Sequence, residues 1–499
     1  MRLKGLLTGA FALLILTSGC KLFGPEEEKS EVDPEASKAK TEEAGRALED
    51  ALGRIKPQAP PQEALKELDL TYARDLYREA VELDPSNSRA HFGMAVTELL
   101  MLLQNERVQE VMDSLSYYLE KFPVGSPVDA AVRSPIAFYR MAKRAWPPGS
   151  AKLAVFKVSD VQKVVEEEVL PAIGRVLKHL EEVEKDPEFK IYVPTESLKP
   201  AVKGMAEGMK EGEFPPLPPP EVPDVDSVEV DLGEVYVLDA QVRLFRALLL
   251  ILTAYNLDFD YEGSYEFFNV ESDSLKLAYL YYLDRNSSFL TLRSEDNPSK
   301  AKDDILTALG KFEDAVAFIR SEDDPQEDDL IAKKDLEALD EEISPDEETP
   351  EFLRDVETIE DLISKVRKLV TEPIPVREDF DHDGEDEELL VNLSVWFDHP
   401  PKDLKALLPY HKWNPENFGN DNFFDDLVLT DAQLNPLGMG DPPFVLPDPS
   451  FGGIFPQFTS NEEFLSFFGL PLTSGPLPVD PLNRSGEGPP LLSSAGRTK

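Results

Sequence analysis

Cysteine is almost absent from this chain of 499 residues, in which Cys20 is the single example. An intramolecular disulfide framework and a zinc site built from several thiolates are therefore excluded. The five histidines, at positions 91, 179, 382, 399 and 411, never fall at the H-x-x-x-H or H-E-x-x-H spacing of zinc enzymes. A glycine-rich phosphate loop and a G-x-S-x-G nucleophile motif are also missing, so we expect no enzymatic activity.

Basic residues are scarce relative to acidic ones. The 51 lysines and arginines face 97 aspartates and glutamates, which gives a formal net charge of −46. Binding to nucleic acid through broad phosphate neutralisation needs a basic face, so no nucleic-acid partner is expected. Hydrophobic residues make up 41% of the chain, enough to bury real cores despite its 43 prolines.

No apolar run in the sequence is both long enough and free enough of charge to span a bilayer. The segment from Leu6 to Leu16 follows the basic start Met1-Arg2-Leu3-Lys4, and it is shorter than the roughly 20 residues that span a bilayer. This pattern is typical of a secretion signal. The sequence Thr17-Ser18-Gly19-Cys20 then resembles the lipobox of bacterial lipoproteins, although that family prefers leucine where Thr17 stands.

The lipoprotein resemblance implies a location and an anchor. In that family the cysteine is diacylated and becomes the mature N-terminus, so Cys20 would attach the protein to a membrane of the cell envelope. Lys21 after the cysteine resembles outer-membrane sorting if the host is a diderm. The alternative is an ordinary signal peptide with an incidental Cys20.

Helical spacing of apolar residues begins near Pro61 and continues to Phe122. Within it, Ala73-x-x-Leu76-Tyr77-x-x-Ala80-x-x-x-Asp84-Pro85-x-Asn87-x-x-Ala90-x-x-Gly93-Met94-Ala95 resembles the junction between two tetratricopeptide repeats. The resemblance covers about 60 residues and implies stacked helix pairs with a protein-binding concave face. An unrelated pair of antiparallel helices is the alternative.

A docking surface is predicted on these helices. Arg74, Arg78, Glu82, Arg89 and Glu98 are expected at exposed positions. On so acidic a chain, Arg74, Arg78 and Arg89 would form a local basic cluster that attracts an acidic segment of a protein partner. The acidic residues 321–348 of the same chain are an alternative occupant.

Further helices are predicted downstream. Ser159 with Gln162 has the pattern of a capping box, and Pro171 should interrupt that helix near Val169. The apolar helix 232–256 contains Arg243 and Arg246, and Asp239 lies four residues before Arg243, which favours a buried helix with an internal ion pair. Asn297-Pro298 and Thr349-Pro350 are predicted to start helices that end near Arg320 and Val370.

The fold class expected from these patterns is mostly α, a helical repeat or bundle with tetratricopeptide-like pairs and an irregular C-terminal region rich in proline and glycine. The predicted organisation is a signal peptide (1–19), an acidic tether (20–58), a repeat-like helical domain (59–212), a proline-rich linker (213–230), a helical bundle (231–372), a loop-rich region (373–470) and a disordered tail (471–499).

One motif predicts a metal-binding site. Asp379-Phe380-Asp381-His382-Asp383-Gly384 matches the D-x-D-x-D-G start of a calcium loop, with Glu387 at the ninth position. The candidate ligands are Asp379, Asp381, Asp383 and Glu387. Position 12 is Leu390 instead of the usual glutamate, so we expect weak binding of Ca²⁺. A chance match in a chain with 97 acidic residues is the alternative.

The function predicted from the sequence is a membrane-anchored envelope protein that binds a protein partner. A lipoprotein that binds a solute or glycan is the alternative, with Tyr279, Tyr281, Tyr282 and Phe267-Phe268 as a candidate aromatic pocket. A hydrolase with a carboxylate pair is a third class, because such pairs form only in space.

Overall fold

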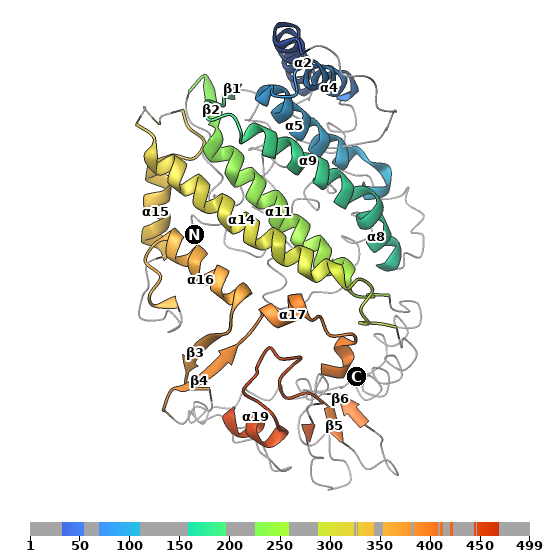
Figure 1. The fold of residues 1–499 in the computed structure, drawn as a ribbon, viewed down its shortest axis with the longest axis vertical. Helices are drawn as coiled ribbons and strands as arrows, with labels where there is room; N and C mark the ends of the chain where they lie inside the picture. The colour runs from blue at the N-terminus through green and yellow to red at the C-terminus, as the bar shows by residue number, and fades with distance from the viewer. Residues whose placement is uncertain are drawn as a thin grey trace, which may run out of the picture.

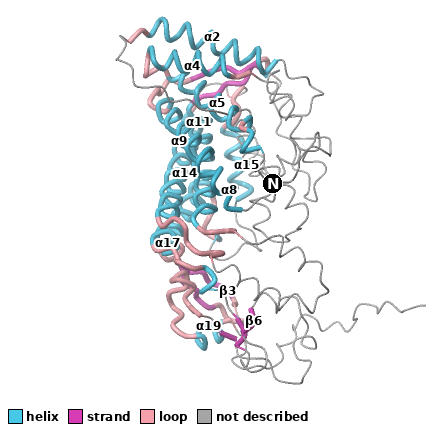
Figure 2. Tube along the Cα trace, turned by 90° about the vertical axis from the view of Figure 1, so that its right-hand side faces the viewer, coloured by secondary structure: helices cyan, strands magenta, loops and turns pink. Residues whose placement is uncertain are grey.

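The computed structural model describes residues 32–53, 69–109, 158–195, 225–258, 288–323, 326, 328–343, 353–380, 384–407, 410–412, 420–422, 444–445 and 447–468. This part of the chain is mostly helical, with eleven α-helices and only small sheets, as the sequence predicts. Figures 1 and 2 show an elongated body in which α2 (Pro34–Gly53) lies at one end and α19 (Asn461–Phe467) at the other.

The N-terminal end is built from three helices. Helix α2 packs along α4 (Thr71–Leu83), and α4 packs against α5 (Ser88–Gln104). The prediction of a solvated tether over residues 20–58 is therefore wrong for residues 34–53. Ser37, Ala44 and Ala51 recur at a seven-residue spacing and are all buried. Such small side chains let two helices approach closely, but they do not form the stripe of large apolar residues by which helices are recognised in a sequence.

The turn between α4 and α5 follows the sequence pattern closely. Helix α4 ends at Leu83, and the Oδ1 atom of Asn87 accepts the Ala90 N–H at 3.1 Å and so caps α5. A Cβ atom on Gly93 would lie 2.2 Å from a ring carbon of Tyr77. Gly93 is therefore required for the close approach of the two helices.

A long interrupted helix comes next. Helix α8 (Val158–Val164) passes through a π-helical turn, η1 (Val165–Val169), into α9 (Leu170–Val183). The interruption predicted near Val169 is confirmed, because Pro171 has no N–H to continue the regular ladder.

The capping box predicted from Ser159 and Gln162 is wrong. The Ser159 N–H donates to Asp258 Oδ1 at 2.7 Å, while Gln162 Nε2 donates to the carbonyls of Leu252 and Tyr255. Gln162 therefore satisfies carbonyls at the C-terminal end of α11 (Leu232–Ala254) instead of capping its own helix.

The central core crosses the predicted domain boundary. Strands β1 (Lys190–Pro194) and β2 (Ser227–Asp231) pair antiparallel, and β2 runs directly into α11, which packs along α14 (Asp296–Ser321). One apolar cluster contains residues of α5, α9, β2 and α11. Residues 227–230, assigned to the linker 213–230, are a buried or half-buried strand, and the predicted domains 59–212 and 231–372 share this core.

Three helices follow the core. Helix α14 agrees well with the predicted range, and α15 (Lys333–Ile343) lies within the acidic residues 321–348. Helix α16 (Ile359–Thr371) begins after Thr358, which forms a capping box with Asp361, and not at Thr349-Pro350.

Short elements make up the C-terminal region. They are β3 (Ile374–Glu378) paired with β4 (Glu387–Val391), α17 (Ser394–Asp398), the 3₁₀ turn η4 (Leu404–Leu407), and a sheet in the order β6 (Asn420–Asn422), β5 (Tyr410–Lys412), β7 (Phe444–Val445). The buried Phe458 ring contacts the rings of Phe455, Phe464, Phe467 and Phe468. The predicted tail 471–499 lies outside the described residues.

Candidate functional site

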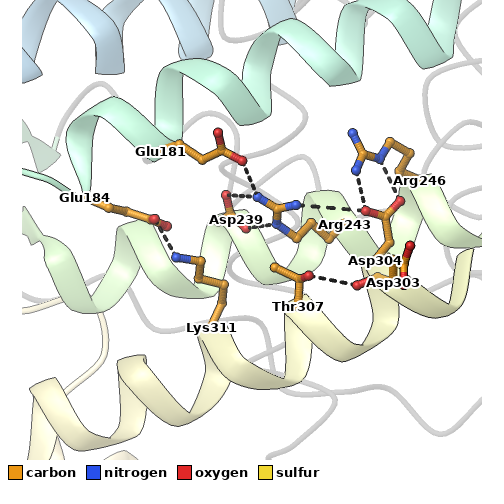
Figure 3. Close-up of polar contacts among 9 residues, drawn as sticks. All are labelled: Glu181, Glu184, Asp239, Arg243, Arg246, Asp303, Asp304, Thr307 and Lys311. Atoms are coloured by element: carbon orange, nitrogen blue, oxygen red, sulfur yellow. Dashed lines mark hydrogen bonds and ion pairs between the residues drawn. The ribbon is translucent and has the colours of Figure 1, made fainter. Parts of the chain in front are cut away.

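Charged side chains gather between α9, α11 and α14, and the side chains in the ion pairs drawn there are buried or half-buried, except the exposed Glu181 (Figure 3). Asp239 is fully buried and accepts a hydrogen bond from Arg243 Nε, one turn along α11, so the predicted ion pair is confirmed. Arg243 also donates to Glu181 Oε1 of α9 at 2.8 Å. Arg246 pairs with Asp304 of α14, where Nε lies 2.6 Å from Oδ2. These contacts tie the three helices together.

Glu184 and Lys311 extend the network toward one end. Glu184 Oε2 accepts from Lys311 Nζ at 2.6 Å, and Lys311 lies over the ring of Tyr236. Burial raises the pKa of Glu184 to about 7, although the hydrogen bond from Lys311 acts in the opposite direction. Burial also raises the pKa of Asp239, against the effect of Arg243.

The network joins four acidic side chains to three cations. They are Glu181, Glu184, Asp239 and Asp304 on one side and Arg243, Arg246 and Lys311 on the other. Because burial disfavours its charged form, Glu184 takes up a proton near neutral pH. Buried pairs of this kind contribute little net stability but are costly to break, so their effect is to fix how the helices align.

A second buried carboxylate joins α4, α5 and α9. Glu98 of α5 is 2% exposed; its Oε1 accepts from Nε and Nη2 of Arg74 on α4, and its Oε2 accepts from the same atoms of Arg175 on α9. The expectation that Arg74 and Glu98 are exposed is wrong, because Arg74 is only 12% exposed. Arg74 is therefore a structural residue and not part of a docking surface.

Arg78 and Arg89 are exposed, as predicted. Arg78 pairs within α4 with Asp75 at 3.1 Å and with Glu82 at 3.8 Å. Arg89 donates to the Lys190 carbonyl of β1 at 3.0 Å. The three arginines thus have separate partners instead of forming one basic cluster.

The loop predicted to bind calcium connects β3 to β4 in a hairpin. Gly384 has φ +97°, the conformation that the motif requires of its glycine, and its N–H donates to Asp379 Oδ2 at 3.1 Å. Glu387 Oε2 accepts the Phe380 N–H at 2.9 Å. Asp381 and Asp383 lie outside the described residues. Among the residues that are described, no group of three or more His, Cys, Asp or Glu side chains could hold a metal ion.

Other predicted residues also lie outside the described ranges. They are Cys20 and the aromatic residues Phe267, Phe268, Tyr279, Tyr281 and Tyr282. Within the described ranges, none of the helices has the length and apolar character to cross a membrane.

Comparison with models of protein families, with curated proteins and with solved structures gives no significant match.

Sequence reasoning missed two contacts between distant segments. Glu98 meets Arg175, 77 positions later, and the ring of His91 meets that of His179, with 2.9 Å between their Nδ1 atoms. A signal for the first existed: Glu98 interrupts the apolar run 94–103 of α5, and a charge in such a position indicates a buried partner. No signal in the sequence pairs the two histidines.

Proposed function

We propose that the protein is a lipid-anchored component of the bacterial cell envelope whose helical body is a scaffold for binding another protein. The observation that carries the proposal is the packing of α2, α4 and α5 around Tyr77 and Gly93, which has the residue pattern of a tetratricopeptide-like junction. Stacked helix pairs bury a continuous core and leave extended faces for partners.

The order of packing supports a stacked arrangement. Helix α2 packs on α4, α4 on α5, and α5 on α9, so the helices of this end stack one on the next. The buried Glu98 pairs with arginines of α4 and α9, and the buried Asp239 pairs with an arginine of its own helix, α11. These ion pairs hold the helices rigidly, as a scaffold requires.

The proposed docking face lies on α4 and the adjoining side of α2. Tyr72 is 57% exposed although it is a large aromatic residue, and its hydroxyl donates to Glu43 Oε1 at 2.6 Å. Arg78 is exposed on the same helix. Tyrosine and arginine are among the residues most enriched where proteins bind one another. This face replaces the cluster that included Arg74.

The anchor is tested at Cys20. The variant Cys20→Ala should leave the membrane fraction or accumulate uncleaved, because Cys20 would carry the acyl chains. A Cys20→Ala protein that is processed normally and stays with the membrane would show that the lipoprotein assignment is wrong.

The docking face is tested by charge reversal. Arg78→Glu should abolish capture of a partner from solubilised envelope proteins, whereas Lys300→Glu, at an exposed position of α14, should not. Both changes are at exposed sites and should leave the melting temperature nearly unchanged. Equal capture by the two variants would place the interface elsewhere.

A structural calcium ion in the loop 379–387 is part of the proposal. The turn at Gly384 supports it, because this glycine has the positive φ that allows the sharp turn of a D-x-D-x-D-G calcium loop.

A further inference from the structure

Two imidazole rings meet where α5 packs on α9. The Nδ1 atoms of His91 and His179 are 2.9 Å apart, and the ring centroids are 5.1 Å apart. On its other side, His91 Nε2 lies 3.0 Å from the carbonyl oxygen of Pro85, in the turn between α4 and α5. His91 is 6% exposed.

These contacts fix the protonation of both rings. A carbonyl oxygen only accepts, so His91 Nε2 carries a hydrogen and, in the neutral ring, His91 Nδ1 is an acceptor. The hydrogen between the rings then belongs to His179 Nδ1. A further proton on His91 Nδ1 would turn two N–H groups toward each other and break the contact.

The charged groups around the pair come from each element that packs there. They are Asp84 of the α4–α5 turn, Glu98 of α5, and Arg175, Glu182 and Lys185 of α9 or just after it. Burial lowers the pKa of His179 to about 4, with His91 acting in the same direction, and burial also lowers the pKa of His91. Both rings are therefore neutral at neutral pH.

The pair sits within a line of polar contacts that hold the N-terminal helices on the body. Ser88 Oγ donates to Asp186 Oδ2 at 2.6 Å, and Arg89 donates to the Lys190 carbonyl. Farther along α5, Glu98 bonds Arg175. Of these contacts, the histidine pair is the one that joins two groups with an ordinary pKa of about 6.5. Once the contact opens, both rings therefore bind protons below about that pH.

We propose that the His91–His179 contact is a proton-sensitive clasp, which holds α5 on α9 at neutral pH and releases the helices α2, α4 and α5 locally in acid. The clasp does not depend on the proposed function. It would make the accessibility of these helices vary with the pH of the compartment.

The expected effect follows from proton linkage. The pKa of the His179 ring is about 4 when the contact is closed and 6.5 when it is open. The equilibrium constant for opening is therefore about 30-fold larger at pH 5.0 than at pH 7.5. The sign is fixed, because a lowered pKa in the closed state means that protons favour the open state.

The test uses the full chain in detergent and measures amide hydrogen exchange in α5 and α9 at the two pH values, corrected for intrinsic exchange. Between pH 7.5 and pH 5.0, the amide protection factors in α5 should fall about 30-fold more in the wild type than in His179→Gln. The glutamine amide of this variant can still donate to His91 but does not titrate. The comparison between variants removes the contribution of other groups, such as Glu184. His399→Gln, which removes a histidine far from the clasp, should behave like the wild type.

A second measurement does not depend on any variant keeping its fold. In protein labelled at its five histidines, nitrogen shifts at neutral pH should show neutral His91 with hydrogen on Nε2 and neutral His179 with hydrogen on Nδ1, and His179 should still be neutral at pH 5.5 because its pKa is about 4. Titration of both rings near 6.5, or equal pH dependence in wild type and His179→Gln, would overturn the proposal. Stabilisation by added Zn²⁺ that is lost in both His91→Gln and His179→Gln would also overturn it, in favour of a metal site.

Discussion

Adding one methyl group to Gly93 should destabilise the protein although it improves the helix. Alanine favours a helix interior over glycine by about 1 kcal/mol. At Gly93, however, the new Cβ atom would lie 2.2, 2.3 and 2.5 Å from three ring atoms of Tyr77. Tyr77 is buried, so its ring cannot swing out into solvent to make room. Overpacking of this kind costs about 1–3 kcal/mol, and such an overlap falls at the upper end.

The net loss expected for Gly93→Ala is therefore about 1–2 kcal/mol. Two matched controls are available in other helices. At Gly174 in α9 and Gly310 in α14, an added Cβ atom would meet no other atom within 4 Å, so the same change there should stabilise by about 0.5–1 kcal/mol.

Urea unfolding followed by circular dichroism measures all three variants in the same chain. The midpoint should fall for Gly93→Ala and rise for the two controls. Combining Gly93→Ala with Tyr77→Leu should recover part of the loss, because the smaller side chain gives way. If Gly93→Ala shifts the midpoint as the controls do, the close packing of α4 against α5 is refuted.

Three further predictions concern charge. Glu98→Gln should lower the free energy of unfolding by about 3 kcal/mol in urea titrations, because it leaves Arg74 and Arg175 without their carboxylate; loss of less than about 0.5 kcal/mol would contradict the buried triad. The pKa of Glu184 is raised by folding, so its stabilising contribution is present below pH 4.5 and is lost as the pH rises toward 7 and beyond; thermal melts of Glu184→Gln should lack this part of the pH dependence, and an unchanged profile would count against it. Millimolar Ca²⁺ should raise the melting temperature of the wild type but not that of Asp381→Ala, and an equal response would exclude a site in the loop.

The helices that the sequence predicts best carry both an apolar stripe and end signals. Helix α4 has Leu76 and Ala80 on its buried face and Asp84-Pro85 at its end, so its end agrees with the structure. Helix α2 falls within the predicted tether because its buried face consists of small residues such as Ala44, which apolar spacing does not detect.

The sequence likewise predicts polar contacts within one helix better than contacts between helices that are distant in the chain. Asp239 and Arg243 are one helical turn apart, so their pairing follows from spacing alone. Glu98 and Arg175, or His91 and His179, meet only because α5 packs on α9. Such long-range contacts depend on how the helices pack, which local periodicity does not specify.

The docking face on α4 and the adjoining side of α2 is proposed to bind another protein. A photoreactive benzoylphenylalanine in place of Tyr72, which is exposed on that face, can be compared in intact cells with the same residue in place of Leu252, exposed at the end of α11. Illumination should attach one discrete protein to the label at position 72, and the product should disappear when Arg78→Glu is added. The absence of any product at position 72, or the same products from both positions, would contradict the account.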